Sequence, residues 1–161
     1  MVVRTLTGRI WYTVSENDGE TWCDPEVLRY KDNGDEVLQP ICCCPIYPLK
    51  DGRYILLYHN NDGTANGGTW PGSSDVNRHP AFLTLGKYRP NAHQPIWFSK
   101  PKKFLDTDHV PIGPQYRVEI ATYTSFTEKE GKRILWYPDR KHFLLGKYVT
   151  DEWLADMNVP E

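Results

Sequence analysis

Residues that could bind an acidic ligand gather in the second half of the sequence. Arg117 and Glu119 are two positions apart, so in an extended strand they share one face, and Tyr123 follows them. A charged cluster, 139–142, comes later and contains Asp139 and Arg140. Because an arginine guanidinium pairs with a carboxylate through two parallel hydrogen bonds, these residues are candidates for a pocket that holds an anion.

Each of these residues also has a purely structural interpretation. Tyr47 occupies the corresponding place in an earlier repeat, so Tyr123 can be a packing residue. Arg78, a further candidate, can be an exposed strand residue that pairs with an acidic neighbour. The 139–142 cluster can be a solvated turn. The sequence leaves both interpretations open.

No metal or cofactor is expected. The histidines lack metal-ligand spacing, and the run Cys42-Cys43-Cys44 lacks the spaced pairs of a zinc or redox motif. In a strand, Cys42 and Cys44 would share one face, where we expect them to pack as small apolar residues. A disulfide between Cys23 and this run stays open. The histidines are His59, His79, His93, His109 and His142.

The composition predicts a folded globular domain and excludes some partners. The chain has 161 residues, of which 39% are hydrophobic and 25% charged, with a net charge of −2. That charge argues against nucleic acid as a partner, and no apolar run approaches the roughly 20 residues of a membrane span. The first residues lack the apolar core of a secretory signal, so we expect a cytoplasmic chain or one that has lost its beginning.

Short aromatic and β-branched runs between turn residues predict an all-β meander. Gly-containing turns at Asp51-Gly52 and Glu130-Gly131 favour hairpins. The segment 60–77 reads as a long loop, and Thr150 is expected to cap a short helical turn over 150–156. The expected strands are 9–14, 39–46, 54–59, 81–85, 96–99, 116–124, 134–137 and 143–149.

An internal repeat organises these runs within one domain, 1–161. Repeat 1 covers about 8–62 and repeat 2 about 78–139, with a last strand at 140–149. A period of about 76 residues carrying four strands suits a large β-propeller blade, so we expect about two four-stranded blades plus an extra strand. Further blades would come from a missing N-terminal half or from self-association. The matched positions are Pro25 with Pro101, Tyr47 with Tyr123 and Gly52 with Gly131.

Ser15-x-Asn17-x-Gly19-x-Thr21-Trp22 resembles the Asp box, or BNR repeat, of the sialidase (neuraminidase) superfamily. Asn17 stands where that family usually has Asp. In the family the box is a hairpin turn in which the Ser and Asp side chains bond the backbone and the Trp packs beneath, and Asn can serve with one acceptor fewer. The box occurs in non-sialidases too, so by itself it implies a fold.

The resemblance covers most of the chain and is to the C-terminal half of a six-bladed sialidase. The order of its segments is that of the family, although each match is weak. The matched segments are Ser15 to Trp22, Asp51 to Tyr58, Arg78 to Leu85, Phe98 to Pro101, Ala121 to Ser125 and Gly131 to Tyr137.

The resemblance implies roles for two residues. Arg78 resembles the last arginine of the three that clamp the substrate carboxylate, and Tyr123 resembles the tyrosine nucleophile. The other arginines, the acid/base Asp and the Glu partner belong to the family's N-terminal half. Two departures stand out: Pro138 replaces a Glu that buttresses the clamp, with Asp139 next to it, and one residue is inserted before Tyr123.

These roles imply a sialidase-like exo-glycosidase acting on a terminal acidic sugar, of which this chain supplies half an active site and is inactive alone. The competing hypothesis is a noncatalytic BNR-repeat module that binds glycan or protein through its aromatic loops and self-associates. Carbohydrate is the expected partner in the first case.

Overall fold

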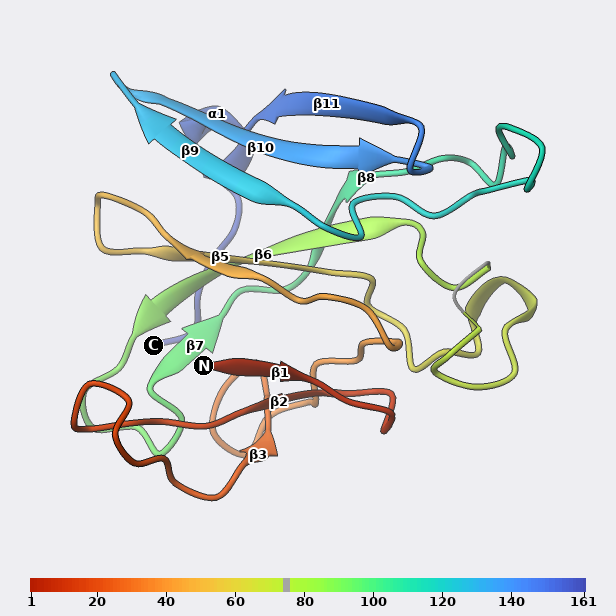
Figure 1. Cartoon of the computed structure of the whole chain (residues 1–161). Coiled ribbons are helices and arrows are strands. Elements are labelled where there is room, and N and C mark those ends of the chain that lie inside the picture. Colours follow the sequence, from red (N-terminus) through yellow and green to blue (C-terminus); the bar gives the residue numbers. More distant parts are fainter. Residues whose placement is uncertain (74–75) are drawn as a thin grey trace.

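A computed structural model describes residues 1–73 and 76–161. In this part of the chain the fold is all-β, with three antiparallel sheets, none of them closed, lying one above another (Figure 1). The strands of the first sheet are β1 (Val2–Arg4), β2 (Ile10–Tyr12) and β3 (Glu26–Val27). Its order is β1-β2-β3.

The middle sheet contains five strands in the order β4-β5-β6-β7, with β8 paired to β6. They are β4 (Ile46–Pro48), β5 (Tyr54–Tyr58), β6 (Ala81–Tyr88), β7 (Ile96–Phe98) and β8 (Lys102–Leu105). The third sheet has the order β11-β10-β9, and its strands are β9 (Ser125–Lys129), β10 (Lys132–Asp139) and β11 (Phe143–Tyr148). A short helix, α1 (Asp151–Leu154), follows it.

The middle sheet is buried on both faces, which explains the continuous apolar run of β5. Ile55 and Leu57 pack toward the third sheet, in a cluster with Leu83 and Leu135. The alternate residues of β5, including Tyr58, pack toward the first sheet. The two hydrophobic cores therefore meet back to back at β5.

Both predicted hairpins form. Gly52 and Gly131 adopt positive φ in the turns that join β4 to β5 and β9 to β10. Tyr47 opposes Ile55 in the first hairpin, as Phe126 opposes Leu135 in the second. These two rings stack at 5.4 Å across neighbouring sheets. The structural counterpart of Tyr47 is thus Phe126, and the expected equivalence of Tyr47 with Tyr123 is wrong.

The expected strand at 116–124 is also wrong. Tyr116 and Ala121 have positive φ, which interrupts an extended backbone, and only isolated bridges at Arg117 and Ile120 remain. The expected strand at 39–46 is wrong as well: β4 begins only at Ile46, because Pro40 and Pro45 offer no N–H to a ladder. The chain described thus forms three sheets of three, five and three strands, in place of the expected four-stranded units.

The remaining local expectations concern the long loop, the cap and the cysteines. The 60–77 segment contains one short 3-10 turn, η1 (Ala65–Gly67), and its residues 74 and 75 lie outside the described residues. Thr150 Oγ1 accepts the N–H of Trp153, so the predicted cap is confirmed. Cys42 and Cys44 are buried as expected, and the cysteines, Cys23 included, are free thiols. Neither helical segment described is long and apolar enough to cross a bilayer.

Candidate functional site

The connections that carry the predicted site residues gather at one end of the molecule (Figure 1). The segment 59–80 joins β5 to β6, 106–124 joins β8 to β9, and 140–142 joins β10 to β11. We call this the loop end. The Asp51-Gly52 and Glu130-Gly131 hairpins lie at the opposite end, so the candidate residues are separated from the tight turns by the length of the strands.

Arg78 lies just before β6 and contacts two other segments, one at Ile41 and one at Ile120. Its Nη2 donates to the carbonyl of Ile41 at 2.6 Å, and its own carbonyl accepts the N–H of Ile120 at 2.9 Å. Its Nε is buried without a hydrogen-bond partner in the described chain, as is Oγ1 of Thr122. Because buried polar groups are almost always paired, these two atoms without partners are unusual.

Cys42 connects Arg78 to the segment before β9. Its Sγ lies 4.0 Å from the carbonyl of Thr122, directly before Tyr123. Burial raises the pKa of the Cys42 thiol to about 11, and the nearby cation of Arg78 only partly offsets this. The thiol is therefore neutral at physiological pH and acts as a packing residue between Arg78 and the Tyr123 segment.

Tyr123 is 60% exposed, and its hydroxyl meets no partner in the described chain. The next residue, Thr124, accepts a hydrogen bond from the hydroxyl of Tyr47 at 2.8 Å through its carbonyl. The backbone at Tyr123 is therefore held while its side chain stays free. This arrangement leaves the phenol available for a ligand at the loop end.

Arg117 and Glu119 meet as expected for neighbours on one face. Arg117 Nη1 donates to Glu119 Oε1 at 2.6 Å, and Lys141 Nζ lies 3.4 Å from the same oxygen. Burial by itself raises the pKa of Glu119, but hydrogen bonds and the two cations outweigh it and hold that pKa below its usual value. Glu119 is therefore ionised, and it neutralises the arginine that was a candidate for binding an anion.

Arg140 links the turn after β10 to the 106–124 connection through hydrogen bonds, and it also pairs with Asp139. Arg140 Nη1 donates to Asp139 Oδ1 at 2.7 Å, while Nε and Nη2 donate to the carbonyls of Val110 and Thr107. The Arg140 side chain is only 12% exposed. These donors hold the 106–124 connection in place, whereas Lys141 and His142 are exposed in the turn that follows β10.

The Ser15–Trp22 segment, between β2 and β3, closes on itself through side chains. Ser15 Oγ accepts the N–H of Gly19 at 2.8 Å, and Asn17 Oδ1 accepts the N–H of Thr21 at 2.9 Å. Asn17 Nδ2 donates to Thr21 Oγ1, and Trp22 Nε1 donates to the carbonyl of Gly19. The side-chain-to-backbone bonds predicted for this turn are thus made.

Replacing Asn17 with alanine should lower the free energy of unfolding by about 1 kcal/mol, because the turn loses its central acceptor. Asn17→Asp should be nearly neutral, since the Thr21 hydroxyl can then donate to the carboxylate. Urea unfolding monitored by tryptophan fluorescence measures both. The exposed neighbour Glu16 supplies the control, and a Glu16→Ala change as large as that of Asn17→Ala would contradict this role.

A groove of about 500 Å³ lies away from the loop end, between the first and middle sheets. Its walls are largely apolar and include Tyr12, Trp22 and Phe98. Ser15, Gly19 and Trp22 of the Asp-box-like turn line it, but none of the predicted catalytic or substrate-binding residues does. We therefore place the candidate chemistry at the loop end, where the charged and hydrogen-bonding groups converge.

A polar cluster at the loop end was not predicted from the sequence. It is formed by His79, Asp106 and His109. The pairing of β6 with β8 brings it together, because Ala81 opposes Leu105 and the residues beyond each strand end become neighbours. A predicted strand at Lys102–Leu105, paired with β6, would have placed these three residues together. In the described residues, no group of three or more acidic, His or Cys side chains is placed to hold a metal ion.

The structure thus places Arg78 next to the segment that carries Tyr123. The other two candidate arginines form ion pairs within the chain, Arg117 with Glu119 and Arg140 with Asp139. A scan of protein-family models finds none that matches this sequence, and no curated protein matches it with significant similarity.

Proposed function

We propose that this chain is part of a sialidase-like glycoside hydrolase and supplies half of an active site for a terminal acidic sugar. The observation that carries the proposal is the setting of Arg78. Its buried Nε lacks a partner, and Cys42 bridges its neighbour Ile41 to Thr122, next to the free phenol of Tyr123. A cation and an unengaged phenol therefore share one end of the fold.

The chemistry suits a sugar that carries a carboxylate at its anomeric carbon. Arg78 would bind the carboxylate, and Tyr123 would attack the anomeric carbon, where a charged Asp or Glu would be repelled. Because Arg117 and Arg140 are engaged by carboxylates of the chain itself, the proposal rests on Arg78 and Tyr123. The stacked sheets would be blades of a propeller that a further segment or further copies complete.

The first test compares the binding of sialyllactose with that of lactose, by isothermal titration calorimetry. The chain should prefer sialyllactose, and Arg78→Gln should weaken this preference about tenfold, as expected for loss of one charged contact of about 1.4 kcal/mol. Arg53→Gln, at the hairpin end, removes an arginine of similar exposure and should change nothing. Equal affinity of the unmodified chain for both sugars would contradict an acidic-sugar site.

A second candidate function is noncatalytic glycan binding, which the exposed aromatic residues of the loop end favour. Trp70 is 54% exposed, Tyr116 77% and Tyr123 60%. Such rings stack on sugar faces without requiring a charge. Affinity that falls in Trp70→Ala and Tyr116→Ala but is unchanged in Arg78→Gln would favour this function. Turnover that disappears in Tyr123→Phe while binding persists would favour the hydrolase.

A further inference from the structure

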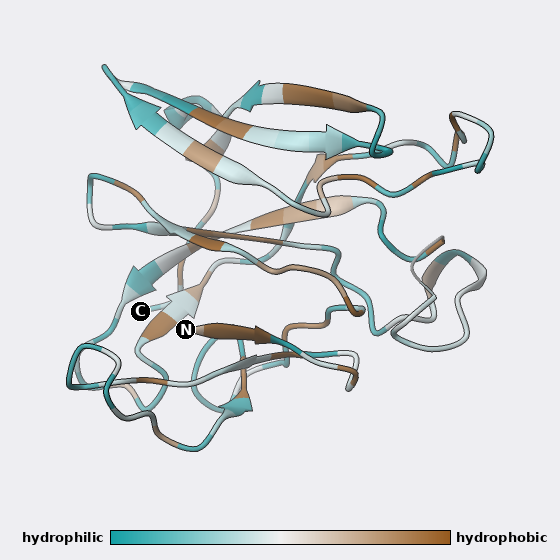
Figure 2. Cartoon of the chain, viewed as in Figure 1, coloured by the Kyte–Doolittle hydropathy of each residue, from teal (hydrophilic) through white to brown (hydrophobic). Residues whose placement is uncertain are grey.

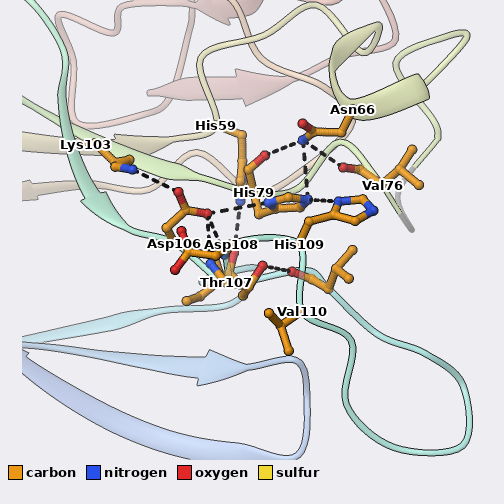
Figure 3. A network of polar contacts seen from close by, with 12 residues as sticks. His59, Asn66, Val76, His79, Lys103, Asp106, Thr107, Asp108, His109 and Val110 are labelled. Atoms are coloured by element: carbon orange, nitrogen blue, oxygen red, sulfur yellow. Dashed lines mark hydrogen bonds and ion pairs between the residues drawn. The ribbon is translucent and has the colours of Figure 1, made fainter.

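His79, Asp106 and His109 form a chain of polar contacts across the start of β6 and the end of β8 (Figure 3). His79 Nδ1 lies 3.6 Å from Asp106 Oδ1, and His79 Nε2 lies 3.0 Å from His109 Nδ1. The His79 side chain is only 4% exposed, whereas His109 is exposed to solvent. The chain therefore runs from a held carboxylate through a buried imidazole to an imidazole at the surface.

Asp106 is held as a carboxylate. Its Oδ1 accepts the N–H groups of Thr107 and Asp108, and its Oδ2 accepts from Lys103 Nζ at 3.0 Å. Burial by itself raises the pKa of Asp106, but Lys103 and the two backbone N–H groups outweigh it, so that pKa lies below its ordinary value. A fixed negative charge thus faces His79.

This charge determines which nitrogens carry protons. His79 Nδ1 is buried without a hydrogen-bond partner in the described chain, and the Asp106 carboxylate lies 3.6 Å from it. This negative charge favours a proton on Nδ1, and His79 Nε2 then keeps its lone pair. The amide of Asn66, although its Nδ2 lies 3.4 Å from the same Nε2, gives its two hydrogens to the carbonyls of Val76 and His79. His109 Nδ1 must therefore donate to His79, which leaves the lone pair of His109 on Nε2.

We propose that Asp106, His79 and His109 form a proton relay, with His109 Nε2 as a general base toward a hydroxyl group or water bound at the loop end. When Nε2 takes a proton from that O–H, His109 becomes an imidazolium. Its charge is then stabilised through the Nδ1–H of His109, through His79 and by the carboxylate of Asp106. His109 is the catalytic base, and His79 and Asp106 position and polarise it.

The surroundings of His79 favour its neutral form. Burial holds the pKa of His79 below its ordinary value, opposed by Asp106 and reinforced by His109 and Arg140. Lys103 faces Asp106 from β8, Asp108 adjoins the loop, and Arg140 approaches from the turn after β10. The relay contains none of the residues proposed to bind the acidic sugar, so its test is independent of that proposed function.

The protonation pattern is directly measurable by ¹⁵N nuclear magnetic resonance of the histidine rings. At pH 7.5 we expect His109 to carry its proton on Nδ1 and a lone pair on Nε2, and His79→Gln to abolish this preference. The exposed His93, which contacts Glu26 at 2.7 Å, serves as reference within the same spectrum. A proton on His109 Nε2 in the unmodified chain would overturn the proposal.

Reactivity with diethyl pyrocarbonate, read residue by residue by mass spectrometry, tests the basicity of Nε2. Asp106→Asn should slow the reaction at His109 at least about threefold, because the positive charge that develops on the ring loses its carboxylate. The reaction at His93 should stay unchanged. The nuclear magnetic resonance spectrum of each variant shows whether it is folded, and an unchanged rate at His109 in folded Asp106→Asn contradicts the relay.

Discussion

Acidification from pH 7 to pH 4 is expected to lower the free energy of unfolding by about 3 kcal/mol through His59 alone. The ring is fully buried, and its Nε2 contacts the carbonyl of Ile120 at 2.9 Å, which requires the proton on that nitrogen. Nδ1 has no partner in the described chain. Burial lowers the pKa of His59 to about 4, with Arg78 and His79 acting in the same direction.

The sign follows from which state takes up the proton first. In the unfolded chain a histidine has its ordinary pKa of 6.5, whereas the pKa of folded His59 is about 4. The unfolded state therefore gains a proton as the pH falls below about 6.5, and the folded state does not. The stability that His59 contributes is fully present above this pH and is lost as the pH falls to 4.

Urea unfolding at four pH values between 4 and 7 measures this loss. Acidic residues also contribute in this range, so the informative quantity is the difference in pH dependence between the unmodified chain and His59→Gln. The variant should show a flatter dependence, whatever its absolute stability. His93→Gln removes an exposed histidine and should behave nearly as the unmodified chain does. The same slope in all three proteins would show that His59 is not the group responsible.

Replacing Leu135 with alanine is expected to lower the free energy of unfolding by about 3 kcal/mol, the cost of a cavity that its neighbours fill only in part. Leu135, at the centre of β10, is completely buried and belongs to the core that joins the third sheet to the middle sheet. The side chain packs in the same cluster as Leu57 and Leu83. Loss of this contact weakens the attachment of the whole third sheet.

Leu144 in the adjacent strand β11 provides a matched control. It is 75% exposed, in a stretch of β11 that is hydrophobic at its surface (Figure 2). Leu144→Ala should change the free energy of unfolding by no more than about 0.5 kcal/mol. Chemical unfolding of both variants gives the comparison directly. Equal losses in the two variants would mean that β11 is covered in solution and that the core assignment at β10 is incomplete.

The sequence predicted those features that depend on residues close together in the chain. The hairpins at Gly52 and Gly131, the cap at Thr150 and the side-chain bonds of Ser15 and Asn17 all involve partners within a few positions. Each is specified by local backbone preference and by short-range hydrogen bonding. The same local rules indicated the all-β class, since turn residues separate the short aromatic and β-branched runs.

Tertiary structure decided what the charged residues do. Arg140 was a candidate for substrate binding, but its donors reach Val110 and Thr107, some 30 positions away, and Arg117 is neutralised by Glu119. The relay of His79 and His109 exists only because β6 pairs with β8. The alternation of side chains shows which face a residue occupies, but not which distant segment covers that face. Only the packing of the sheets determines which charges stay free for a ligand.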